Sequence, residues 1–108
     1  MQLTFLKGYP DMVGRRRIYC GTGVGPTSYS QTTGDVLSNP GYDAYWDMVF
    51  VTPPDSTNTY YAIPRLNATG PRATWSLHWY DAATFTEVSN ATNLSTYTLQ
   101  VAGFGGQY

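Results

Sequence analysis

The strongest constraint on the fold is the spacing of the apolar side chains, which alternate with polar ones along most of the segments that contain them. In the segment 72–80, for example, Ala73, Trp75, Leu77 and Trp79 all fall on one side of an extended chain. A period of two predicts a half-buried strand, whereas an amphipathic helix spaces its apolar residues three or four positions apart. The segment is therefore expected to be a strand that packs its tryptophans into a core.

The same alternation recurs often enough to predict six to eight short strands. The other candidates are Gln2–Lys7, Val13–Cys20, Tyr45–Val51, Thr59–Leu66 and Ser95–Ala102, with shorter ones near Asp35–Leu37 and Phe85–Val88. In the strand 45–51, the alternation places Trp46, Met48 and Phe50 on one face, which is expected to face the core. The segments between the candidates are rich in Gly, Pro, Asn, Ser and Thr, which favour turns.

Two segments are not expected to form strands. Gly21–Gly41 is rich in Gly, Ser, Thr and Pro, so it is predicted to be mostly connection. Residues 103–108 contain too many glycines for a packed strand end. They are expected to form either a flexible tail or one that docks on a neighbour through Phe104 and Tyr108.

Length and composition agree with one all-β domain over residues 1–108. Charged residues make up 12% of the 108 residues, against roughly 25% in an average globular domain, and Lys7 and Glu87 are the only residues of their types. Helices are usually surfaced with Glu and Lys, so long helices are not expected. The predicted fold is a single-domain antiparallel β-sandwich of six to eight strands, and the sequence leaves a jelly-roll or an Ig-like strand order open.

The charge pattern argues against nucleic acid and membranes as partners. The net charge is −1, and Arg15, Arg16 and Arg17 form the one basic cluster, which suits an edge strand or a contact patch better than a DNA site. No apolar run approaches the roughly 20 residues that span a bilayer. The first residues read as a strand and not as a signal peptide, so we expect no export by the Sec pathway.

The residues that usually carry catalysis are few and scattered. His78 is the one histidine, and alternation places it on the face opposite Trp75 and Trp79, at the surface or in an interface. Cys20 is expected to be a small apolar residue. Asp43 and Asp47 would lie about 13 Å apart on a strand, too far to share acid–base chemistry. We therefore expect no enzyme activity, no metal and no cofactor.

Several stretches, in the same order along the chain, resemble small structural proteins encoded beside the capsid genes of tailed bacteriophages. Residues 25–35, GPTSYSQTTGD, are similar to a Gly-Pro-(Ser/Thr)-Ser-Tyr-x-x-Gly-Gly-Asp pattern, with Thr33 where that pattern has its first glycine. The opening stretches FLKG at 5–8 and VGRRR at 13–17, and the later stretches WYDAATFTEV at 79–88 and NLS at 93–95, also resemble these proteins.

The resemblance implies a noncatalytic virion protein that decorates or cements the outside of the head shell. Such proteins are sandwiches or jelly rolls that bind the major capsid protein, often as dimers or trimers, in a virion assembled in the host cytoplasm. The expected contacts with the capsid or between copies are Arg15, Arg16, Arg17, Tyr29, Tyr45, Tyr60, Tyr80, Phe104 and Tyr108. The alternatives are a carbohydrate-binding module that uses exposed aromatic residues, on the head or the tail, and a small hydrolase built on His78.

Overall fold

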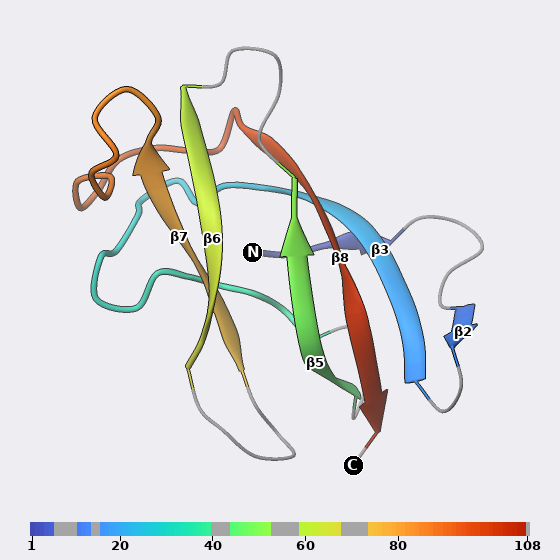
Figure 1. Ribbon diagram of the computed structural model, residues 1–108. Coiled ribbons are helices and arrows are strands. Elements are labelled where there is room, and N and C mark those ends of the chain that lie inside the picture. Colours follow the sequence, from blue (N-terminus) through green and yellow to red (C-terminus); the bar gives the residue numbers. More distant parts are fainter. Residues whose placement is uncertain (6–10, 14–15, 40–43, 53–58, 68–73, 108) are drawn as a thin grey trace.

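The computed structural model describes residues 1–5, 11–13, 16–39, 44–52, 59–67 and 74–107, and within them the regular elements are strands (Figure 1). The strands are β1 (Thr4–Phe5), β2 (Asp11–Val13), β3 (Arg16–Val24), β4 (Asp35–Val36), β5 (Ala44–Val51), β6 (Tyr60–Leu66), β7 (Trp75–Asp81) and β8 (Thr98–Gln107). They pair antiparallel in two sheets, which confirms the predicted all-β sandwich.

The large sheet has the order β1-β3-β8-β5, and β2 also pairs with β3. β1 lies opposite Gly21 and Thr22, and β2 lies opposite residues 16–18, so the two short strands follow one edge of β3 in succession. The small sheet has the order β4-β7-β6. Figure 1 shows β6 and β7 on one side of the molecule and β5, β8 and β3 on the other.

The chain passes from one sheet to the other between most consecutive strands. β6 and β7 form a hairpin, whereas β3, β4, β5 and β6 lie alternately in the large and the small sheet. The pairing is nested, because β3 pairs with β8 while β4 and β7, which lie between them in the sequence, pair with each other. In an Ig-like sandwich the fifth strand lies between the second and the fourth strands of its sheet. Here the strand between β3 and β5 is β8, the last one in the chain, so the strand order is not Ig-like.

The core lies between the sheets and is rich in aromatic residues. Trp46 and Trp79 are fully buried, together with Leu77, Leu99 and Val101, as the alternation predicts. Buried tryptophans need a partner for the indole N–H. Trp46 donates to the carbonyl oxygen of Ser38 at 2.9 Å, and the half-buried Trp75 donates to the carbonyl oxygen of Trp46 at 3.1 Å.

A β-bulge in β5 makes the predicted inward face of this strand wrong after Trp46. The register with β8 shifts between Trp46 and Met48, which inserts Asp47 as an extra residue. A bulge reverses the side to which the following residues point. Trp46 is therefore buried, but Met48 and Phe50 are 49% and 54% exposed, and Val49 takes the inward position that alternation gave to its neighbours.

The glycine-rich end of the described chain is strand and not a free tail. Residues 98–107 form β8, which pairs with β3 on one side and with β5 on the other. At Gly103 a Cβ atom would collide with the carbonyl oxygen of Met48 and lie 3.0 Å from the Trp46 ring, so the close approach of β5 requires glycine. Gly21–Val24 likewise belong to β3, contrary to the predicted connection.

Candidate functional site

Two loop segments complete the edge of β7 where the short strand β4 ends. β4 pairs only with Ser76 and Leu77. Farther along β7, the backbone N–H of Trp79 donates to the Tyr29 hydroxyl at 3.1 Å, and the carbonyl oxygen of Trp79 accepts from the N–H of Val88 at 2.9 Å. A side chain and a loop thus satisfy backbone groups that a longer β4 would have paired.

Tyr29, His78 and Glu87 form a hydrogen-bonded cluster at this edge. The Tyr29 hydroxyl donates to Glu87 Oε2 at 2.7 Å, and His78 Nδ1 lies 3.1 Å from the same oxygen and 3.4 Å from the hydroxyl. His78 is only 8% exposed, so its expected place at the surface is wrong. It does lie on the face opposite Trp79, but Tyr29 and Glu87, which come from two loops, cover it there.

The cluster shifts the pKa values of two of its members in opposite directions. Burial and the bond to Glu87 raise the pKa of the Tyr29 hydroxyl above its ordinary 10.0. Burial alone would raise the pKa of Glu87, but the hydrogen bonds from Tyr29 and His78 outweigh it and lower that pKa below 4.5. A neutral tyrosine bonded to an ionised carboxylate is therefore the stable arrangement at neutral pH.

The hydrogen bonds of the cluster hold the loops of Tyr29 and Glu87 against β7, and its polar groups bond to one another. In the described part of the chain, the side-chain hydrogen-bond partners of His78 are Tyr29 and Glu87, and no serine, threonine or cysteine is bonded to it as a nucleophile would be. The same residues contain no group of three or more His, Cys, Asp and Glu placed to hold a metal ion. They also form no helix with the length and apolar character needed to cross a membrane.

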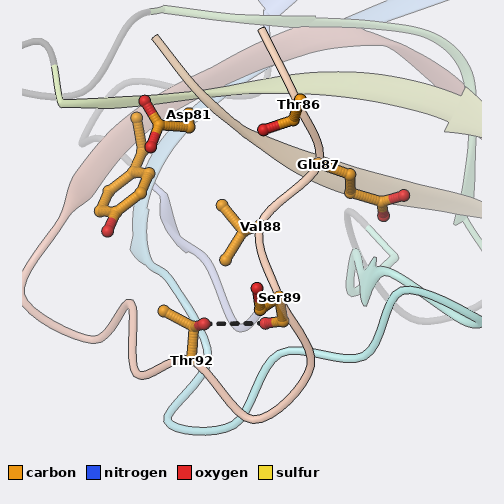
Figure 2. A pocket seen from close by; sticks show the side chains of 7 residues that line it. Asp81, Thr86, Glu87, Val88, Ser89 and Thr92 are labelled. Atoms are coloured by element: carbon orange, nitrogen blue, oxygen red, sulfur yellow. Dashed lines mark hydrogen bonds between the residues drawn. The ribbon is translucent and has the colours of Figure 1, made fainter. Parts of the chain in front are cut away.

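A pocket of about 150 Å³ opens beside the cluster at one end of the small sheet. It is lined by Tyr60, Asp81, Thr86, Glu87, Val88, Ser89 and Thr92. Figure 2 shows the Val88 side chain between Asp81 and Thr92, whereas the Glu87 carboxylate points away from that space. The lining combines one accessible carboxylate with hydroxyl groups and a small apolar floor.

Part of the outer face of the large sheet is apolar, and we call this part the outer patch. Residues in direct register across β3, β8 and β5 point to the same side of the sheet. One such row is Ile18, Phe104 and Met48, and the next is Cys20, Ala102 and Phe50. All six side chains are uncharged, Met48 and Phe50 are about half exposed, and the other four are partly exposed.

The structure brings two of the expected contact residues to the outer patch. Phe104 belongs to it, and Tyr45 pairs with Gly106, two positions farther along β8 on the same face. Arg17 is exposed at the end of β3, and Arg16 is described through its backbone pairing with Val13. Arg15 and Tyr108 lie outside the described residues.

The remaining tyrosines are placed elsewhere. Tyr29 is 2% exposed and its hydroxyl is used inside the protein, so it does not offer a contact to a partner. Tyr60 lines the pocket. Tyr80 stacks on Tyr61 at 5.5 Å with an interplanar angle of 18°, and its hydroxyl accepts a hydrogen bond from Arg65. These two rings face each other, so they do not form the flat platform on which a sugar chain could stack.

Sequence reasoning missed most of the outer patch and the pocket. Met48 and Phe50 were expected in the core because nothing in the alternation shows that Asp47 is a bulge residue. Asp81, Ser89 and Thr92 come together only because the chain after β7 folds back, with a single bridge between Tyr80 and Glu87. Comparison with known protein families, curated proteins and solved structures gives no match.

Proposed function

We propose that this protein is a noncatalytic structural component of a phage virion that binds the outside of the head shell. The observation that carries the proposal is the outer patch, an uncharged apolar surface over β3, β8 and β5. Contiguous apolar surface of this kind marks interaction sites in soluble proteins. The major capsid protein is the proposed partner, with a dimer or trimer of this chain as the binding unit.

The fold and the sequence support this proposal independently of the outer patch. The nested pairing of β3 with β8 and of β4 with β7 favours a jelly-roll strand order, and jelly rolls occur in viral capsid and lectin domains. The stretches at 25–35 and 79–88 resemble phage virion proteins. A shell also presents many equivalent sites, so a modest apolar contact in each copy of an oligomer becomes strong through multivalency.

The test is cosedimentation of the purified protein with empty heads of the phage that encodes it. Phe50→Thr combined with Met48→Thr removes apolar surface from the outer patch. The matched control is Ile63→Thr on β6, which is 43% exposed on the other sheet. We expect stoichiometric binding of the wild type and of the control, and at least a tenfold loss for the double variant, because a buried apolar side chain contributes about 1.5–3 kcal/mol.

Two results would contradict the proposal in different ways. Binding that the double variant retains in full would move the contact away from the outer patch. No binding by the wild type to heads or to other parts of the virion would end the structural proposal altogether. Light scattering of the free protein in the same buffer measures the oligomeric state, and a monomer would remove the multivalency argument.

A further inference from the structure

The pocket at the end of the small sheet contains polar groups that the described chain leaves unused. Asp81 accepts from the Ala83 N–H through Oδ1 at 2.8 Å, which closes a local turn. Within the described ranges, no hydrogen bond reaches Asp81 Oδ2, the Tyr60 hydroxyl or the Ser89 hydroxyl. All three residues line the pocket, and among the described residues these three polar atoms have no protein partner.

The positions of these groups are fixed by the surrounding structure. Tyr60 and Asp81 are directly paired across β6 and β7. The Asp81 N–H donates to the Thr86 carbonyl oxygen at 2.8 Å, and the Thr92 hydroxyl donates to the Ser89 carbonyl oxygen at 2.8 Å. The hydrogen bond between Glu87 and Tyr29 holds the segment from Thr86 to Ser89 in place. A preorganised pocket loses little entropy when it binds a ligand.

The chemistry of the lining selects a polyhydroxylated and uncharged ligand. A carboxylate oxygen accepts hydrogen bonds from ligand hydroxyl groups, and the Tyr60 and Ser89 hydroxyls can both donate and accept. The Tyr60 ring and Val88 provide apolar surface for the C–H groups of a ring. The carboxylates of Asp81 and the nearby Glu87 would repel an anionic ligand.

The size of the pocket limits the ligand to a single ring. The pocket has a volume of about 150 Å³ and is open to solvent on one side. It can hold one six-membered ring in part and is too small to enclose a disaccharide. We propose that this pocket binds one neutral sugar ring, such as the terminal hexose of a glycan, through Asp81, Ser89 and Tyr60. This inference is independent of binding to the head shell.

The proposal is tested on the isolated full chain by titration with methyl glycosides of glucose, galactose and mannose, followed by saturation-transfer NMR and calorimetry. We expect at least one of the three to bind with a dissociation constant on the order of 1 mM, which suits a ligand of this size. Methyl glucuronate, which adds a carboxylate to the same ring, is expected to bind at least tenfold more weakly because of the two carboxylates.

Asp81→Asn is the decisive variant, since the asparagine oxygen can still accept from the Ala83 N–H and keep the turn. It is expected to weaken binding roughly tenfold or more, because bonds to a charged acceptor are the strong ones. Asp47→Asn on β5 removes the same charge from the other sheet and should leave the affinity unchanged. Thermal unfolding of each variant verifies that the fold is retained.

Each alternative result overturns the inference. No binding of any of the three glycosides excludes a neutral sugar site. Equal losses in Asp81→Asn and Asp47→Asn would place the binding outside the pocket, and equal affinity for methyl glucuronate would contradict the charge argument. Shifts of the pocket signals with calcium ions but with no glycoside would make it a cation site. The head-shell experiment uses different residues, so either proposal can fail alone.

Discussion

On the outer face of the small sheet, Ser76 and His78 are polar and yet buried, because Asn67, Tyr29 and Glu87 lie over them and bond to them. On the outer face of the large sheet, Met48 and Phe50 are apolar and yet about half exposed. An antiparallel sandwich usually shows polar residues outward and apolar residues inward on both sheets. Here loop residues cover Ser76 and His78 with a bonded polar cluster, while Ile63 on the same face stays 43% exposed. On the large sheet, Met48 and Phe50 have no such cover among the described residues and stay about half exposed.

The largest loss of unfolding free energy is expected at Gly103, where β5 and β8 pack most closely. Gly103→Val would drive a side chain into the Met48 carbonyl and the Trp46 ring, so we expect a loss of at least about 3 kcal/mol or no folding. Ala102→Val, one residue away on the outer patch, adds its methyl groups to an open face and should change the unfolding free energy by about 0.5 kcal/mol or less. Urea denaturation measures both, and equal losses would contradict the assignment of the two faces.

A smaller loss is expected when the polar cluster over the small sheet is broken. Tyr29→Phe leaves the Trp79 N–H without its partner and leaves Glu87 with His78 alone, at a cost of about 2 kcal/mol. Tyr61→Phe on β6 is the control, because no hydrogen bond to its hydroxyl is found within the described ranges, and it should be nearly neutral. If the two variants unfold at the same denaturant concentration, the cluster does not hold the loops of Tyr29 and Glu87 in place.

Acid should reduce the stabilisation that the Tyr29, His78 and Glu87 cluster provides, whereas the outer patch has no group that titrates in acid. The folded-state pKa of Glu87 lies below its ordinary 4.5, so its contribution is fully present above about pH 4.5 and is lost as the pH falls through the folded-state value. Glu87→Gln keeps an acceptor oxygen, adds an amide donor and does not titrate. Its unfolding free energy should fall less steeply than that of the wild type below pH 4.5 in pH-dependent denaturation, and parallel curves would contradict the shift.

The smallest effect on stability is expected on the outer patch. Met48→Thr and Phe50→Thr replace side chains that already lie about half in water, so each should change the unfolding free energy by about 0.5–1 kcal/mol. The same variants are expected to lose binding to the head shell. A loss of several kcal/mol in either variant would show that these side chains serve the fold of the monomer and are not free for a partner.

The sequence predicted those parts of the fold in which the backbone follows a simple period. Leu77, Trp79, Leu99 and Val101 are buried as the alternation requires, because β7 and β8 are regular there. The alternation in β5 fails at Asp47, because a bulge inserts one extra residue and no residue type in the sequence indicates it. The glycines of β8 were interpreted as a tail, but they lie in a strand, and Gly103 allows β5 to approach closely.

The candidate sites were less predictable because they depend on contacts between distant segments. Tyr29 and Glu87 are separated by 58 positions, and no local pattern indicates that they share a hydrogen bond. The burial of His78 depends on loops that cross it and not on its own strand. The pocket requires residues from β6, from β7 and from the segment that follows. Periodicity describes one element at a time, so it could not assemble these sites.

The position of β8 also has a consequence for how the protein is made. Its pairings join Arg17 to Gly105 and Val51 to Val101, so the large sheet closes only when the chain has been synthesised through this strand. Until then, a nascent chain on the ribosome presents the edges of β3 and β5 without their shared partner, and open edges invite pairing with other chains. Fast completion of translation therefore protects the chain from pairing with its neighbours during this stage.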